Sequence, residues 1–175
     1  MKMSREWAMP SPDTFSIAPI AALLDRWLKG KNRIVDPFAS NSLRAHFSND
    51  LNPETAAEYH MEAVEYLDFL LGRGVKADAI LIDPPYSPRQ ISECYKSVGR
   101  TVGIEETQNA RLYKGVKDAA HRLAGQGTIV ICCGWNSAGM DKSRYKKQEI
   151  LLVAHGGAHN DTIVTVDLLL QGSLL

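Results

Sequence analysis

Two nearly continuous apolar runs, AILI at residues 79–82 and IVICC at residues 129–133, most constrain how this chain can fold. Runs without polar alternation are typical of strands that are buried on both faces, as in a parallel sheet with helices on each side. Apolar residues at helical spacing predict helices at 17–31, 63–74 and 105–125, before and between these runs. Strands and helices therefore alternate along most of the chain.

Shorter apolar stretches complete this pattern. Strands are predicted at 32–38 and 45–50, and residues 148–171 are interpreted as two strands joined through HGGAHND. Because the last two strands follow each other directly, we expect an α/β protein with a doubly wound, Rossmann-like, mostly parallel sheet and an antiparallel strand near the C-terminus. Residues 87–106 show no clear pattern, and the absence of a linker predicts a single domain over 1–175.

The charge and cysteine content narrow the class of protein. Twenty Lys and Arg balance twenty Asp and Glu, so no net field draws the chain toward nucleic acid or membrane. The three cysteines are not spaced as a disulfide framework or a zinc site, which predicts a reducing compartment and no metal. The start of the chain has no apolar core of the kind a secretion signal needs, and no apolar run could span a bilayer. We therefore expect a cytoplasmic protein without a membrane partner.

The strand predicted at 32–38 leads into DPFASNS, which has the composition of a ligand-binding turn. In open sheets of this class, ligands lie outside the carboxyl ends of the strands. Asp36 can bind a hydroxyl or ammonium group there, and the small residues that follow let the backbone approach a ligand closely. Asp50 follows the next predicted strand, where such folds often hold a ribose. An Asp36 that only caps a helix is the alternative interpretation.

The run at 79–82 ends in DPPY, residues 83–86. Two successive prolines give a stiff segment with free carbonyls, since proline has no N–H. Asp83 adds acceptor oxygens and Tyr86 adds a flat face. Acceptors beside a stacking ring suit a planar group that carries an exocyclic NH2. The alternative is a rigid surface turn in which Asp83 is satisfied locally.

Taken together, these motifs resemble those of the S-adenosylmethionine-dependent amino-methyltransferases, the DNA adenine-N6 and cytosine-N4 enzymes. The likeness is greatest to short phage-type adenine-specific DNA methyltransferases. It rests on TFSI, DPFA, NDLNPE, DPPYSPRQ, GWNS and HNDTIVTV, and it covers residues 14–167. Two departures stand out: Ser40 and Ser42 occupy positions where the family commonly has glycines, and no separate target-recognition domain is present.

The resemblance implies methyl transfer from S-adenosylmethionine to the N6 amine of adenine in DNA, with no metal. It implies a catalytic group made of Asp83, Pro84, Pro85 and Tyr86. It also implies a cofactor-binding group made of Phe15, Ser16, Asp36, Pro37, Phe38, Ala39, Asp50 and Glu62.

Substrate contacts are expected from residues 87–106 and 134–147, which carry several Lys and Arg residues that can contact phosphates. Arg89 belongs to the first segment. Trp135 and Asn136 follow a buried strand end and can flank a target base. The alternatives are ordinary solvated charges and simple packing of Trp135.

Other functions stay open. The target can be cytosine N4 or an RNA amine, or the chain can be a catalytically weak cofactor-binding decoy or interaction module. The serines at 40 and 42 favour the decoy, whereas the intact DPPY favours the enzyme. Without a recognition domain, specificity is expected to be relaxed or to depend on a recognition subunit or a homo-oligomer. His155 and His159 are interpreted as loop polarity rather than as a metal pair.

Overall fold

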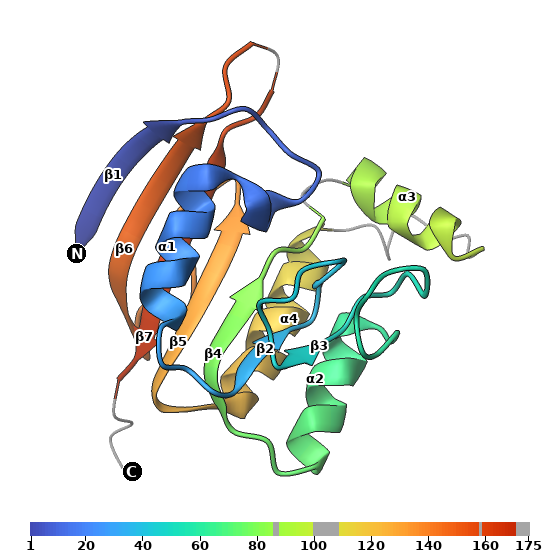
Figure 1. Cartoon of the computed structure of the whole chain (residues 1–175). Helices are drawn as coiled ribbons and strands as arrows, with labels where there is room; N and C mark the ends of the chain where they lie inside the picture. Colours follow the sequence, from blue (N-terminus) through green and yellow to red (C-terminus); the bar gives the residue numbers. More distant parts are fainter. Residues whose placement is uncertain (86–87, 100–108, 158, 171–175) are drawn as a thin grey trace.

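A computed structural model describes residues 1–85, 88–99, 109–157 and 159–170. Within them, seven strands form one sheet in the order β1-β6-β7-β5-β4-β2-β3 (Figure 1). The strands are β1 Lys2–Trp7, β2 Ile34–Asp36, β3 Phe47–Ser48, β4 Ala77–Ile82, β5 Ala124–Gly134, β6 Tyr145–Ala154 and β7 Thr162–Leu169. The helices are the 3-10 turn η1 Thr14–Ser16, α1 Ala18–Leu28, α2 Ala63–Gly72, α3 Pro88–Ser97 and α4 Asn109–Leu123.

Strand directions confirm the predicted fold class. The pairs β2–β3, β2–β4, β4–β5 and β1–β6 are parallel, and β7 is antiparallel to both β5 and β6. The sheet is therefore mostly parallel, with its antiparallel strand near the C-terminus. The carboxyl ends of β2, β4, β5 and β6 consequently lie at one edge of the sheet, which is the upper edge in Figure 1.

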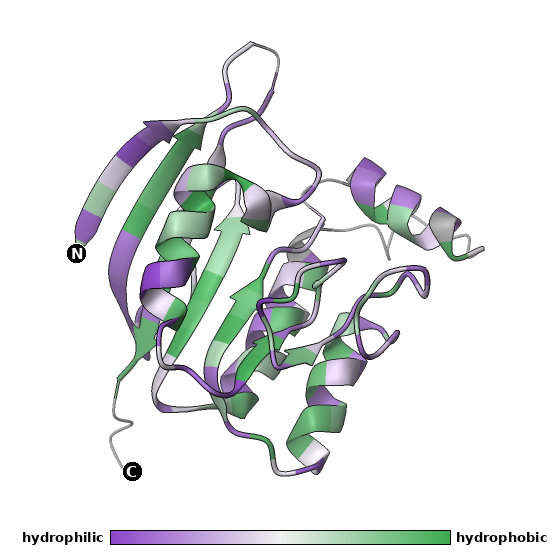
Figure 2. Cartoon of the chain, viewed as in Figure 1, coloured by the Kyte–Doolittle hydropathy of each residue, from purple (hydrophilic) through white to green (hydrophobic). Residues whose placement is uncertain are grey.

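Helices cover both faces of the sheet, as the apolar runs predicted. On β4, Ala79 and Leu81 join the core under α1, whereas Ile80 and Ile82 join the core under α2 and α4. The same alternation divides β5, and Figure 2 shows the resulting apolar centre of the sheet. Side chains on both faces are buried, so a strand with no polar alternation is the stable choice here.

The sequence analysis did not predict two of the observed elements. The first is β1, which has exposed or half-exposed side chains throughout and was not predicted as a strand. The second is α3, which lies within residues 87–106 and carries mostly polar side chains. The predicted helix at 105–125 is present as α4 but ends at Leu123, and its first residues lie outside the described part. In the described ranges, no helix has the length and apolar character that a membrane crossing requires.

The order of the strands creates a switch point next to β2. From β2 the chain continues to β3 on one side and then returns, through α2, to β4 on the other side. Connections that leave in opposite directions open a crevice at the carboxyl ends of the two central strands. Residues 37–40 and 83–85 follow these two strand ends directly.

Candidate active site

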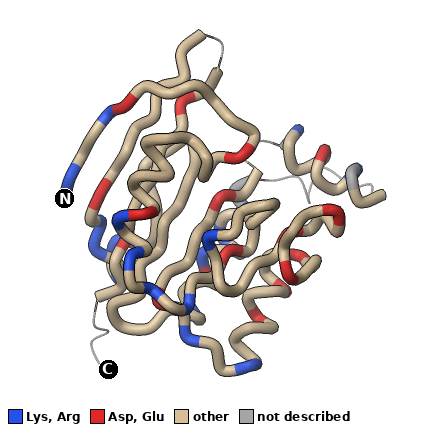
Figure 3. Tube along the Cα trace, in the orientation of Figure 1, with Lys and Arg blue, Asp and Glu red and all other residues tan. Residues whose placement is uncertain are grey.

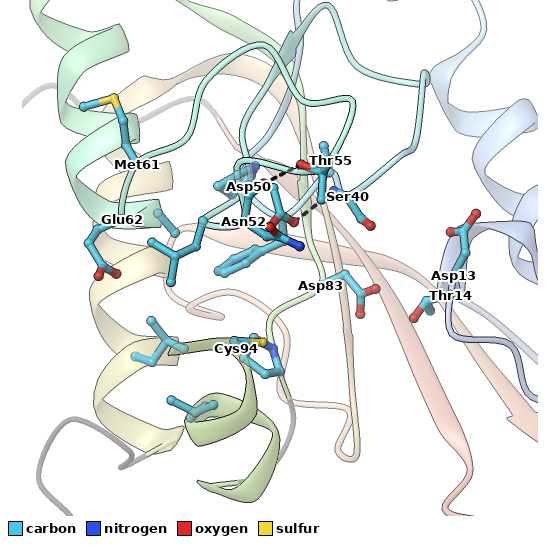
Figure 4. Close-up of a pocket in the computed structure, with 18 of the residues that line it drawn as sticks. Asp13, Thr14, Ser40, Asp50, Asn52, Thr55, Met61, Glu62, Asp83 and Cys94 are labelled. Carbon is cyan, nitrogen blue, oxygen red and sulfur yellow. Dashed lines mark hydrogen bonds between the residues drawn. The ribbon is translucent and has the colours of Figure 1, made fainter. Parts of the chain in front are cut away.

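A cavity of about 340 Å³ lies at this switch point (Figure 4). A small-molecule site typically has a volume of roughly 300–1,000 Å³. Four segments far apart in the sequence contribute its walls. They are the stretch before α1 (Pro12, Asp13, Thr14, Phe15), the turn after β2 (Pro37, Phe38, Ala39, Ser40), the loop after β3 (Asp50, Leu51, Asn52, Thr55) and the end of β4 (Asp83, Pro85).

The turn after β2 is held by hydrogen bonds between its own residues. The Phe38 N–H donates to Oδ1 of Asp36 at 2.9 Å, and the Ser42 N–H donates to the Ala39 carbonyl at 2.8 Å. Ser40 has a φ of 47°, in the left-handed region that favours glycine. The departure from the family's glycine pattern therefore has a structural cost at Ser40, whereas Ser42 has no positive φ.

Asp50 links that turn to the loop after β3. Its Oδ2 accepts the Ser40 N–H at 3.0 Å, and its Oδ1 accepts the Asn52 N–H at 2.9 Å. Each carboxylate oxygen has a second lone pair, so Asp50 can still accept a hydroxyl from a ligand in the cavity. Asp50 thus lines the cavity and positions the turn, and its role as a ribose-binding acid stays a prediction.

Asn49 is a positioning residue that the sequence did not reveal. Its side chain is fully buried and donates to the carbonyls of Pro37 and Met61 at 3.2 and 3.0 Å. Its Oδ1 accepts the Met61 N–H at 2.9 Å. One amide therefore ties together the turn after β2, the end of β3 and the segment before α2. An Asn next to Asp50 gives no sequence signal for this role, because its partners are backbone atoms.

Asp36 lies beneath the cavity and does not line it. The side chain is fully buried, and its Oδ2 has no hydrogen-bond partner. Burial raises the pKa of Asp36 to about 8, and the nearby carboxylates of Asp83, Asp50 and Asp13 add to this rise. Asp36 is therefore mostly protonated at neutral pH. Its clear structural role is to hold the turn through Phe38.

The segment after β4 reaches the cavity with part of the DPPY motif. Asp83 is half-buried and lines the cavity together with Pro85, whereas Pro84 is buried. Figure 4 shows the Asp83 carboxylate between the loop that carries Asp50 and the segment that carries Asp13. Tyr86, the fourth residue of the motif, lies outside the described residues.

The last wall of the cavity comes from α2 and α3. Glu62, just before α2, accepts a hydrogen bond from the Tyr95 hydroxyl of α3 at 2.8 Å. Ile91 of α3 is buried against the cavity, and Cys94 also lines it. The amphipathic α3 is thereby attached to the body of the protein through the site itself.

Charge is distributed unevenly over the described lining. It contains four carboxylates, from Asp13, Asp50, Glu62 and Asp83, and no Lys, Arg or His. Such a lining favours a cationic ligand and disfavours a phosphate group. It also provides acceptors, rather than donors, for hydroxyl and amino groups.

Of the remaining predicted site residues, only one lines the cavity. Phe15 is buried and lines it, but Ser16 is exposed and bonds to Ser11 and Asp13 instead. Trp135 and Asn136 follow β5 at the same edge of the sheet, and neither lines the cavity. Arg89 is exposed on α3 and pairs with Glu93 at 2.8 Å.

The basic residues of 134–147 were expected to contact the substrate, but most of them lie far from the cavity. Lys142, Arg144 and Lys146 lie at or just before the start of β6, the edge opposite the cavity, where the Lys and Arg positions of Figure 3 gather. Lys147 points into the protein, and its Nζ lies 3.0 Å from Oδ1 of Asp167. These residues are consequently not neighbours of the cavity.

The structure separates the two histidines that were interpreted as loop polarity, since His159 is exposed and His155 is not. His155 is buried, and its two ring nitrogens lie 2.8 Å from the Ala8 carbonyl and 2.9 Å from the Thr162 hydroxyl. It therefore fastens the end of β1 to β6 and β7. No group of His, Cys, Asp and Glu side chains within the described ranges is arranged to hold a metal ion.

Comparisons with known proteins identify the fold. No protein-family model matches the sequence, and no curated protein does. The structure is similar to TrmN from Thermus thermophilus, with a TM-score of 0.55 and 17% identity over 90% of this chain and 50% of that chain. It is similar to NSun6 from Pyrococcus horikoshii with SFG, with a TM-score of 0.54 and 15% identity over 87% and 52%.

A SAM-dependent methyltransferase from Agrobacterium tumefaciens is also similar, with a TM-score of 0.50 and 10% identity over 86% of this chain and 61% of that chain. The chain has the Rossmann-like fold of S-adenosylmethionine-dependent methyltransferases. It spans about half the length of TrmN and NSun6.

Proposed function

We propose that this chain transfers a methyl group from S-adenosylmethionine to the exocyclic N6 amine of adenine in DNA. One observation carries the proposal. The turn after β2 and the start of DPPY after β4 open onto the same cavity, and its described lining has four carboxylates and no cation. The similar folds, among them a SAM-dependent methyltransferase, support the same assignment.

The lining fits S-adenosylmethionine better than it fits a dinucleotide. The sulfonium and ammonium groups of this cofactor are cationic, and its ribose offers hydroxyl donors. Carboxylates at Asp13, Asp50 and Glu62 complement both. A dinucleotide would bring a pyrophosphate into the same acidic space.

The bound cofactor supplies an electrophilic methyl group. The protein's task is to hold the target nitrogen with its lone pair toward that methyl group, since the lone pair of an aromatic amine is delocalised into the ring. We assign the acceptance of the two amine N–H bonds to Asp83 and the Pro84 carbonyl. Their fixed positions would orient the amine and stabilise the positive charge that develops on nitrogen. Stacking on the base is assigned to Tyr86.

The acidic lining also determines how DNA can approach. A base inside a duplex cannot reach such a cavity, so it must be flipped out or be single-stranded. The phosphates would stay outside the cavity, because its carboxylates repel them. We assign contacts with the flanking strand to Arg89 on α3 and to Trp135, which follows the carboxyl end of β5. Cys94, Cys132 and Cys133 form no disulfide with one another, which suits the reducing cytoplasm.

A second candidate is a cofactor-binding module with weak catalysis. The strained Ser40 favours it, because a positive φ at a residue other than glycine costs on the order of 1 kcal/mol or more. The presence of Asp83 in the cavity favours the enzyme.

Incubation with methyl-labelled cofactor and a mixture of DNA and RNA, followed by digestion to nucleosides and mass spectrometry, tests both candidates. N6-methyladenine from DNA supports the proposal. N4-methylcytosine or a methylated ribonucleoside would change the substrate. Cofactor binding without any methylated nucleoside would support the module.

A further inference from the structure

The strand β1 forms one end of the sheet and exposes an unusual amount of apolar surface. In the described residues, seven large apolar side chains are exposed, and four of them are Met1, Met3, Trp7 and Met9, in β1 and its flanks. Met3 and Trp7 are 68% and 66% exposed. β1 has six residues, and within the described ranges no further strand pairs with its outer side. Such an edge strand is a template for pairing with another strand.

The backbone of β1 has a defined free side. The Ala8 N–H donates to the Ala154 carbonyl at 3.1 Å, so the backbone of even-numbered residues points toward β6. Because the direction alternates along a strand, the N–H and C=O groups of Met3, Arg5 and Trp7 point away from the sheet. These groups are positioned to bind a further strand.

We propose that a second copy of this chain pairs its β1 antiparallel with this β1, about a two-fold axis through Ser4. In this register Met3 lies opposite the partner's Arg5, and Met1 lies opposite the partner's Trp7. All four residues have outward backbone groups, so each pair can exchange two hydrogen bonds. The partner is another copy because the strand complements itself, as an isologous interface requires.

Charge complementarity selects this register. Lys2 then lies opposite the partner's Glu6, and the two symmetric copies of this pair flank the axis on the same face of the sheet. They are non-hydrogen-bonded pairs, whose side chains approach most closely. Lys2 is exposed and already contacts Glu149 at 3.3 Å, so its ammonium group would bridge two carboxylates. A shift by one residue in each copy would instead place Arg5 opposite the partner's Arg5, where like charges repel.

This dimer goes beyond the proposed function and does not depend on it. In the sheet order, β1 is the first strand, and β2, whose end contributes to the cavity, is the sixth of seven. The two-fold axis would extend the sheet to two copies and leave both cavities open. Antiparallel pairing would also direct the carboxyl edges of the two sheets in opposite directions. Each cavity would therefore bind its own ligand.

The first test compares the mass of the protein in solution with that of two variants. Wild type is expected to be a dimer by light scattering and by sedimentation. Arg5→Pro removes an outward N–H that only the dimer uses, so it should raise the dissociation constant by at least about tenfold. Arg5→Ala keeps that N–H and should stay dimeric. A monomeric wild type would overturn the proposal, and so would an Arg5→Pro protein that melts normally and dimerises like wild type.

The second test identifies the register in a Cys94→Ser background. Ser4→Cys places two sulfurs across the axis, at a Cα separation of about 4.5 Å, within the roughly 4.4–6.8 Å of disulfides. Mild oxidation should therefore link Ser4→Cys chains rapidly. Glu6→Cys is the matched control, because the two copies of residue 6 would be about 13 Å apart along the strands. Equal cross-linking at both positions, or faster linking at residue 6, would exclude this register.

Discussion

The backbone N–H of Ser40 donates to Oδ2 of Asp50 at 3.0 Å, while Ser40 itself has a φ of 47°. The carboxylate that lines the cavity thus holds in place the one non-glycine residue with a positive φ in the described ranges. A strained position of this kind persists only when its surroundings fix it. We therefore predict that ligand binding at Asp50 and the conformation of the turn are coupled.

Ser40→Gly should be tolerated better than Ser42→Gly. Glycine at position 40 relieves the cost of the left-handed conformation. At position 42 it increases the freedom of the unfolded chain and removes the hydroxyl that accepts the Arg44 N–H at 3.4 Å. We expect the free energy of unfolding of Ser40→Gly to exceed that of Ser42→Gly by about 1 kcal/mol. Urea denaturation of both variants measures this difference. Equal stabilities would show that the turn carries no strain at Ser40.

Removal of the Asp83 carboxylate should separate catalysis from cofactor binding. Asp83→Ala is expected to slow methyl transfer by about 100- to 1000-fold in single turnover, as loss of a preorganised charge-stabilising group does. Asp83→Asn should fail as well, because its NH2 would face the substrate amine as a donor. Calorimetry with S-adenosylhomocysteine should give nearly wild-type affinity. If Asp83→Ala transfers the methyl group at the wild-type rate, DPPY is a stiff turn without a catalytic role.

The raised pKa of Asp36 predicts how stability depends on pH. The folded protein keeps the proton up to about pH 8, whereas the unfolded chain releases it near pH 4. Between these values the folded state binds more protons, so this residue lowers stability progressively as pH rises. Asp36→Asn cannot titrate and should flatten this part of the profile. Melting temperatures of both proteins from pH 4 to pH 9 provide the measurement, and parallel profiles would contradict the buried, neutral Asp36.

Loss of the Asn49 amide should destabilise the loops around the cavity. Asn49→Ala leaves the buried Pro37 carbonyl and the part-buried Met61 carbonyl and N–H without their partner, and one unsatisfied buried group costs about 1–3 kcal/mol. We expect a loss of at least about 2 kcal/mol in the free energy of unfolding, together with weaker cofactor binding. Asn52→Ala is the control for stability alone, since its Oδ1 only accepts the exposed Glu54 N–H but the residue lines the cavity. Similar losses in the two variants would argue against a special role for Asn49.

Local sequence patterns were sufficient for the central part of the fold. The apolar runs of β4 and β5 have no polar alternation, and only burial on both faces makes that composition stable, so the parallel sheet followed from them. The same reasoning placed Asp50 and Asp83 at strand ends on one edge. Polar and turn-forming residues that follow a strand of a parallel sheet lie at the carboxyl edge of that sheet.

Contacts between distant segments were decided only by the tertiary structure. The strand character of β1 comes from pairing with β6 more than 140 residues away, which no local pattern records. Asn49 acts through backbone atoms of Pro37 and Met61, and Asp36 is below the cavity instead of in it. The sequence determined which residues can form buried strands and where polar groups must leave them. Which of those polar groups meet a ligand depends on packing between segments, because burial and hydrogen-bond partners are properties of the assembled chain.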